Sequence, residues 1–176
     1  GYVPTPDIDL DQINMAAKLI SEAKRPLALV GQGVILGGAE KELMQFLKKT
    51  DTPAASTLLG LSAMPTDFPL NKGFLGMHGN IAPNMKTNEC DVLIAIGMRF
   101  DDRVTGDLKT YAKQAKVIHL DIDPAEVDKN VKATVKVLGD VKTTLPMLTE
   151  RVSEAKHSDW IDSFKTYEEK EMRSVI

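Results

Sequence analysis

One segment of the sequence concentrates groups that could do chemistry. In Gly97–Gly106, Arg99 and Arg103 flank the adjacent carboxylates of Asp101 and Asp102, directly after a buried-type apolar run. Adjacent aspartates can ligate a metal or act as acid and base. Neighbouring side chains diverge, however, and no third carboxylate or histidine stands nearby at ligand spacing. Two other interpretations remain open: arginines that bind an anion while the aspartates orient them, and a surface cluster of ion pairs.

Glycines and acidic residues also follow the other apolar runs. They occur in Gly31–Gly33, Thr57–Gly60, Gly97–Arg99, Asp121–Asp123 and Gly139–Asp140. Glycines let the backbone approach a phosphate closely, and carboxylates accept hydrogen bonds from ribose hydroxyls or adenine amines. Together these turns indicate a nucleotide crevice. Each turn alone is compatible with an ordinary turn, since the first one lacks the third glycine of G-x-G-x-x-G.

The three histidines and the single cysteine have different expected roles. His119 lies within an apolar run and is expected to be a packed, hydrogen-bonded core residue, whereas His157 lies in a polar segment and is expected to be solvated. His78 precedes a helix in a long loop, a position that favours ligand contact, with a structural role as the alternative. One cysteine, Cys90, excludes an internal disulfide and a cysteine-based metal cluster, and a small packed thiol is the simple interpretation.

The elements that would position these residues alternate between strands and helices. Short apolar runs predict strands over 27–30, 53–57, 91–96, 116–120 and 134–138, and helical spacing predicts helices over 9–24, 39–47, 80–89, 141–154 and 159–172. Asp9 and Asn80 are expected as N-caps. This alternation predicts an α/β fold, a doubly wound, mostly parallel, Rossmann-like sheet of five or six strands with helices on both faces. Such sheets bind ligands at the carboxyl ends of their strands.

Composition narrows the class of protein. The 176 residues are 43% hydrophobic, which suits one compact domain, and the net charge of −3 lacks the basic field that a non-specific nucleic-acid binder needs. The apolar runs fall far short of the roughly 20 residues that span a bilayer, and the start has no signal-peptide pattern. We therefore expect a cytoplasmic protein without nucleic-acid or membrane partners. Residues 1–8 are expected to be an interdomain linker, 9–156 a central nucleotide-binding domain, and 157–176 a C-terminal helix leading toward a further domain of a longer protein.

Several segments resemble the large catalytic subunit of acetolactate synthase. They are Leu75–Gly79, Gly97–Gly106, His119–Asp123, Glu126–Asn130 and Val137–Val141, in that family's order and at its spacing. The resemblance covers nearly the whole chain, and the string from Arg99 to Gly106 separates this family from related thiamine enzymes such as pyruvate oxidase. It implies the central domain of a three-domain subunit. The parent enzyme would decarboxylate pyruvate and join the two-carbon unit to pyruvate or 2-ketobutyrate, the step that opens branched-chain amino-acid synthesis.

The resemblance also implies an FAD site, in which the flavin is bound but is not needed as an electron carrier. Gly31 and Gly33 would lie against the pyrophosphate, and the flavin or its linker would contact Thr57, Leu58, Met77 and His78. The linker and phosphates would be held by Gly97, Arg99, Asp101, Arg103 and Val104. The ribose and adenine would be surrounded by Asp121, Ile122, Glu126, Gly139, Asp140 and Val141. Arg103, Asp102 and Met77 would also border the substrate channel.

The same resemblance says what this chain should not do alone. The glutamate that activates thiamine belongs to the family's first domain, and the G-D-G…N-N motif that holds diphosphate and magnesium belongs to its third. Thiamine diphosphate and Mg²⁺ are therefore expected in the parent enzyme and not on this chain, which should be inactive. Expected partners are the remaining domains of the subunit, further copies in a homo-oligomer, and a regulatory small subunit.

Three alternatives to an FAD-binding domain of a transferase stay in view. An electron-transfer flavoprotein-like domain would use its FAD for redox chemistry. A sirtuin-like deacylase shares the architecture but needs zinc cysteines, which a single cysteine cannot supply. A linker domain would bind nothing once separated from its neighbours.

Overall fold

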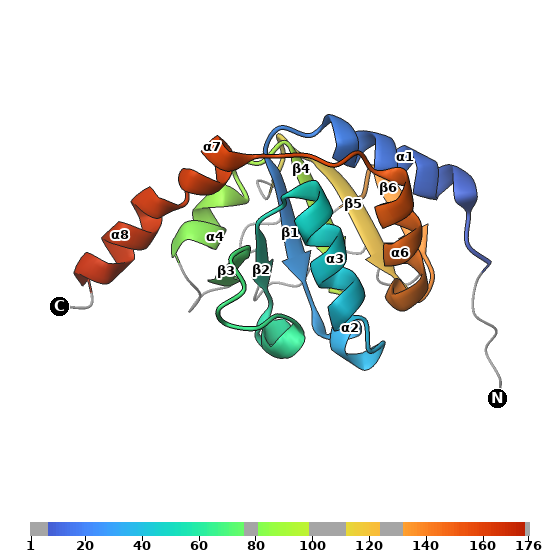
Figure 1. Ribbon diagram of the computed structural model, residues 1–176, viewed down its shortest axis with the longest axis horizontal. Coiled ribbons are helices and arrows are strands. Elements are labelled where there is room, and N and C mark those ends of the chain that lie inside the picture. Colours follow the sequence, from blue (N-terminus) through green and yellow to red (C-terminus); the bar gives the residue numbers. More distant parts are fainter. Residues whose placement is uncertain (1–6, 76–80, 99–111, 124–131, 175–176) are drawn as a thin grey trace.

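The computed structural model describes residues 7–75, 81–98, 112–123 and 132–174 (Figure 1). Six parallel strands form one sheet in the order β3-β2-β1-β4-β5-β6. Their bounds are Pro26–Val30 (β1), Ala54–Ser56 (β2), Asn71–Phe74 (β3), Val92–Ile96 (β4), Lys116–Asp121 (β5) and Val135–Leu138 (β6). The chain leaves β1 toward one edge and returns at β4 to build the other half, so the strand order switches between β1 and β4. The predicted doubly wound, parallel sheet is confirmed.

Helices cover both faces of this sheet. The bounds are Leu10–Glu22 (α1), Gln32–Leu36 (α2), Glu40–Thr50 (α3), Ile81–Lys86 (α4), Val141–Arg151 (α6), Ser158–Asp162 (α7) and Lys165–Ser174 (α8), with a 3-10 turn over Leu58–Ala63 (η1). Helices α1, α3 and α6 share one hydrophobic cluster with the sheet, while α4 and α7 contribute to the cluster on the opposite face. In the described part of the chain, no helix combines the length and apolar character needed to cross a bilayer.

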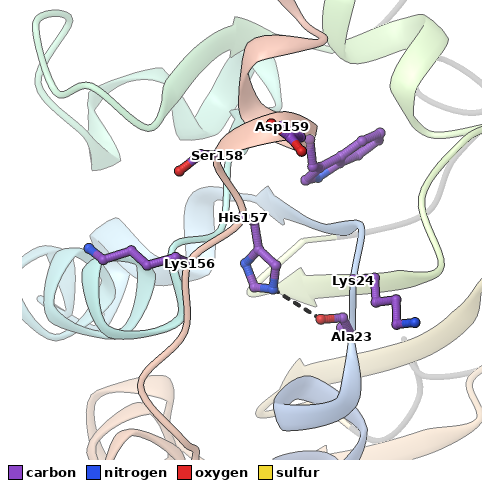
Figure 2. Close-up of a pocket in the computed structure, with 7 residues that line it drawn as sticks. Ala23, Lys24, Lys156, His157, Ser158 and Asp159 are labelled. Atoms are coloured by element: carbon purple, nitrogen blue, oxygen red, sulfur yellow. Dashed lines mark hydrogen bonds between the residues drawn. The ribbon is translucent and has the colours of Figure 1, made fainter.

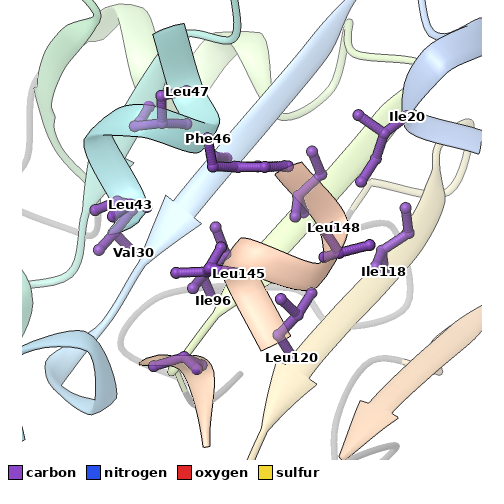
Figure 3. Close-up of a cluster of buried hydrophobic side chains, with 14 of the residues drawn as sticks. Ile20, Val30, Leu43, Phe46, Leu47, Ile96, Ile118, Leu120, Leu145 and Leu148 are labelled. Atoms are coloured by element: carbon purple, nitrogen blue, oxygen red, sulfur yellow. The ribbon is translucent and has the colours of Figure 1, made fainter. Parts of the chain in front are cut away.

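The two clusters follow from the alternation of side chains along buried strands. All five residues of β1 and of β4 are buried, which explains why these strands are continuous apolar runs. On one face Ile118 and Leu120 of β5 pack with Leu145 of α6 (Figure 3). On the other face, Leu27, Leu93 and Val117 are among the residues that pack with the C-terminal helices.

The first helix confirms its sequence signal. The Asp9 side chain accepts hydrogen bonds from the amides of Asp11, at 2.9 Å, and Gln12, at 3.4 Å, as an N-cap does. Ile13 and Ile20 lie buried on the face that the apolar spacing predicted. The second expected cap, Asn80, lies outside the described residues.

Three local predictions were wrong. Strand β3 was not predicted, because Asn71-Lys72-Gly73-Phe74 lacks an apolar or alternating pattern; it forms as an edge strand by backbone pairing with β2. The expected turn at Gly31–Gly33 opens into the short helix α2. The helix expected over 159–172 is divided into α7 and α8 at Ser163–Phe164, where the turn places Phe164 in the core with no exposed surface.

Candidate functional site

The predicted site residues that the structure describes lie at one edge of the sheet. Because all six strands are parallel, their carboxyl ends meet there. Gly31 and Gly33 follow β1, Thr57 and Leu58 follow β2, and Gly97 follows β4. Asp121 is the last residue of β5 and Ile122 follows it, while Gly139, Asp140 and Val141 follow β6. The other predicted residues fall outside the described ranges, namely Met77, His78, Arg99, Asp101, Asp102, Arg103, Val104 and Glu126.

The exit turns of β1 and β4 touch each other at the switch point. The Gly31 amide donates to the Ile96 carbonyl at 3.0 Å, and the Gly33 amide donates to the Gly97 carbonyl at 2.9 Å. A Cβ on Gly31 would stand 2.4 Å from the Gly97 oxygen, and Gly97 itself has a φ of +60°. Backbone packing therefore requires glycine at positions 31 and 97 even when no ligand is bound. Since both amides are already bonded, Gly31 and Gly33 could offer a phosphate only their Cα surfaces.

A third glycine, Gly60, closes the same contact from β2. A Cβ on Gly60 would lie 2.6 Å from the Val30 carbonyl oxygen, so η1 packs directly on the end of β1. This packing leaves large apolar side chains in solvent: Leu58 is 68% exposed, Leu59 67% and Leu36, at the end of α2, 76%. Such a group of exposed leucines suits an apolar ligand ring or a covering protein surface. From the sequence, Gly60 was placed in a turn of the predicted crevice but was assigned no contact with FAD.

The predicted acidic residues hold their own turns. One carboxylate oxygen of Asp121 accepts from the amides of Ile122 (2.7 Å) and Asp123 (3.1 Å). The Asp140 side chain accepts from the Lys142 amide at 3.0 Å and so caps α6. Both carboxylates therefore stabilise their own turns, whether or not a ribose is bound. Among the described residues, no group of three or more His, Cys, Asp or Glu side chains could hold a metal ion.

Two histidines make well-defined contacts. His119 has no exposed surface, and its Nε2 lies 2.9 Å from the Met98 carbonyl oxygen, so the predicted packed, hydrogen-bonded role is confirmed. The expectation that His157 is solvated was wrong. It is half-buried, with Nδ1 3.0 Å from the Asp51 carbonyl oxygen and Nε2 3.0 Å from that of Ala23. These contacts tie the segment after α6 to the ends of α1 and α3, a long-range arrangement that local polarity does not reveal.

A hollow of about 460 Å³ lies beside His157 (Figure 2). Its lining includes Ala23 and Lys24, which precede β1, and Lys156 and Asp159 from the segment around α7. It therefore sits at the amino edge of the sheet, at the opposite end from the predicted site. The predicted site residues do not line it.

Cys90 is fully buried, which agrees with the expected packed thiol, and its Sγ lies 3.3 Å from the Thr87 carbonyl. Burial, reinforced by the carboxylate of Asp91, raises the pKa of the Cys90 thiol to about 12. The thiol is therefore protonated at neutral pH and is a poor nucleophile.

Lys86 forms a buried contact that sequence reasoning missed. Its ammonium nitrogen lies 4.8 Å from the ring centre of Trp160, 5.3 Å from that of Tyr167 and 5.4 Å from that of Phe164. It also donates to Ser163 Oγ at 2.8 Å and pairs with the Glu89 carboxylate at 3.2 Å. The aromatic spacing of the last helices was the available signal, but nothing in the sequence indicates which lysine the rings surround.

Comparison with known proteins decides which family this fold and this set of turns represent. Residues 13–148 match the family described as the thiamine pyrophosphate enzyme, central domain. The chain belongs to this family. The matched region contains all six strands and the helices from α2 to α4, together with most of α1 and α6.

Relatives of this central domain include large subunits of acetolactate synthase, which confirms the resemblance drawn from the motifs. A probable large subunit from Methanocaldococcus jannaschii is 50% identical over 145 residues, 82% of this chain and 24% of the relative. The isozyme 2 large subunit of Escherichia coli K12 is 45% identical over 149 residues, 85% of this chain and 27% of the relative. The large subunit from Corynebacterium glutamicum is 43% identical over 170 residues, 94% and 27% respectively. The chain thus spans about a quarter of the length of the relatives it matches.

Proposed function

We propose that this chain is the FAD-binding central domain of an acetolactate synthase large subunit. The observation that supports the proposal most directly is the meeting of the exit turns of β1, β2, β4, β5 and β6 at one edge, on both sides of the strand-order switch. Open parallel sheets bind dinucleotides at this place. The relatives named above make acetolactate synthase the matching parent enzyme.

The described geometry supports a particular assignment of residues to the parts of FAD. The amides of Gly31 and Gly33 are bonded to the carbonyls of Ile96 and Gly97. The described exit turns contain no arginine or lysine, and the cation next to them is Lys142, in the first turn of α6. We therefore assign the charge of the pyrophosphate to Arg99 and Arg103, which follow β4 in sequence and would suit bidentate phosphate contacts. Asp101 and Val104 would complete that phosphate-binding turn.

The remaining roles follow the position of each strand end. Thr57 and Leu58, with Met77 and His78, would contact the flavin side, where exposed leucines offer apolar surface. Asp121, Ile122 and Glu126 would border the ribose, and Gly139 to Val141 the adenine. Ile122 is 52% exposed and supplies an apolar surface for a base. These assignments would suit an elongated ligand with an apolar ring at each end and charge in the middle.

The parent enzyme's activity is part of the same proposal. It would bind thiamine diphosphate and Mg²⁺ through its other domains, decarboxylate pyruvate, and transfer the two-carbon unit to pyruvate or 2-ketobutyrate. This chain would supply FAD and a wall of the channel at Met77, Asp102 and Arg103. Its partners would be the other domains, further copies of the subunit and a regulatory small subunit. The parent enzyme would be located in the cytoplasm.

A calorimetric titration of the chain with FAD, ADP, NAD⁺ and thiamine diphosphate tests the proposal. FAD should bind, ADP should bind more weakly, and thiamine diphosphate should give no heat. NAD⁺ binding in preference to FAD would overturn the assignment of the strand-end residues. Silence from FAD would overturn the proposal that this chain binds FAD, because it would show that the domain by itself does not form the flavin site. Reduction of the bound flavin by a physiological donor at a useful rate would instead favour an electron-transfer flavoprotein.

A further inference from the structure

One imidazole lies between two of the exit turns that the proposed function assigns to FAD. His119 is in the middle of β5, pairs in register with Ala95 of β4, and has no exposed surface. Strand alternation places its side chain on the same face as Val117, in the cluster that also contains Met98. The ring therefore reaches from β5 toward the end of β4.

The contact with Met98 fixes both the imidazole and the turn. Nε2 lies 2.9 Å from the Met98 carbonyl oxygen. A carbonyl can only accept, so Nε2 must carry the hydrogen. Because a peptide unit is planar, the hydrogen bond to the Met98 carbonyl also fixes the orientation of that whole peptide unit. Met98 directly follows Gly97 in the exit turn of β4. This is the turn against which Gly31 and Gly33 pack.

The same nitrogen faces the exit turn of β5. The second carboxylate oxygen of Asp121 lies 3.7 Å from Nε2, while its first oxygen organises the amides of Ile122 and Asp123. The Gly97 amide donates to the Leu120 carbonyl at 2.9 Å, which brings the two turns together through the backbone as well. One buried ring is thus in contact with Met98, after β4, and adjacent to the exit turn of β5, to which the proposed function assigns the ribose.

We propose that His119 is a positioning residue for the FAD site, which holds the exit turn of β4 against that of β5 so that phosphate and ribose groups bind in register. The inference rests on the proposed function, because it assigns His119 a role in that same site. It predicts that replacing His119 lowers FAD affinity even in a variant that stays folded, because the Met98 carbonyl would no longer be held beside the exit turn of β5.

The test compares three variants by FAD titration, at a temperature where circular dichroism shows each to be folded. His119→Leu removes the donor at similar volume and should weaken FAD binding about tenfold or more. His119→Gln can present an amide N–H near the Nε2 position and should recover most of that affinity. His157→Leu is the matched control, because it removes ring contacts to two backbone carbonyls at the opposite edge. It should lower the thermal midpoint and leave FAD affinity unchanged.

Nitrogen NMR of the imidazoles provides a measurement that needs no variant to fold well. Spectra of the wild-type chain should show His119 with hydrogen on Nε2, whereas a neutral ring protonated only on Nδ1 would overturn the inference. Unchanged FAD affinity in His119→Leu would also overturn it while leaving the FAD proposal intact. Failure of the wild-type chain to bind FAD is a separate result, which would overturn the proposed function and the role of His119 with it.

Discussion

The ammonium of Lys86 should be coupled to the Trp160 ring by more free energy than a surface lysine gains from a ring. Its side chain is 4% exposed and its nitrogen lies 4.8 Å from the indole centre. A cation over a ring contributes about 0.5–1 kcal/mol at exposed sites and about 2 kcal/mol when desolvated. We therefore expect a coupling energy near 2 kcal/mol for this pair.

A double-mutant cycle isolates this coupling from the other partners of Lys86. Lys86→Met, Trp160→Leu and the double variant are unfolded in urea, followed by circular dichroism. Contacts of Lys86 with Glu89 and Ser163 are lost equally in both arms of the cycle and cancel. Trp160 is the only tryptophan in the chain, so its fluorescence in Lys86→Met also reports directly on loss of the ammonium.

The matched control is Lys48 over Phe68, where the lysine is exposed and the nitrogen lies 5.9 Å from the ring centre. The corresponding cycle should give about 0.5 kcal/mol or less, and 1 M salt should reduce it further. The buried pair should keep its coupling in salt. A coupling below about 0.5 kcal/mol for Lys86 and Trp160, or equal values for the two pairs, would refute the claim that desolvation strengthens the contact.

The remaining predictions concern packing, the thiol and the ligand site. Gly31→Ala should lower the free energy of unfolding by about 1–3 kcal/mol, because the new Cβ would clash with the Gly97 carbonyl oxygen. Gly38→Ala is the control, since there only the φ of +66° disfavours alanine. A smaller loss of stability in Gly31→Ala than in Gly38→Ala would contradict the prediction. Cys90, with its pKa raised to about 12, should resist a disulfide reagent at pH 8 until the chain unfolds. Because the folded pKa is the higher one, the contribution of the thiol to stability is full below about pH 9 and is lost as pH rises toward 12. Urea titrations of Cys90→Ala should lack this part of the pH dependence. Arg103→Ala should weaken FAD binding by about 1–3 kcal/mol with the fold intact, and an unchanged calorimetric affinity would return that arginine to a surface role.

Local sequence signals predicted the framework of this domain well. The continuous apolar runs of β1 and β4 predict strands buried on both faces, and Asp9 predicts the start of α1. These predictions succeed because each signal depends only on residues that are near neighbours in the chain. Parallel pairing then follows from the alternation of strands with helices. The motifs around Arg99 and Asp121 are specific enough to indicate the family from sequence alone.

The tertiary structure was needed wherever the role of a residue depends on a partner that is distant in the sequence. Strand β3 exists because β2 offers it a backbone edge, and its own residues carry no strand pattern. Gly31 must be glycine because Gly97, 66 positions later, lies against it. His157 and Lys86 find their partners on other elements, at the ends of α1 and α3 and on α7 and α8. Local sequence encodes propensity and periodicity, whereas these contacts arise only when the sheet brings separate strand ends and helices together.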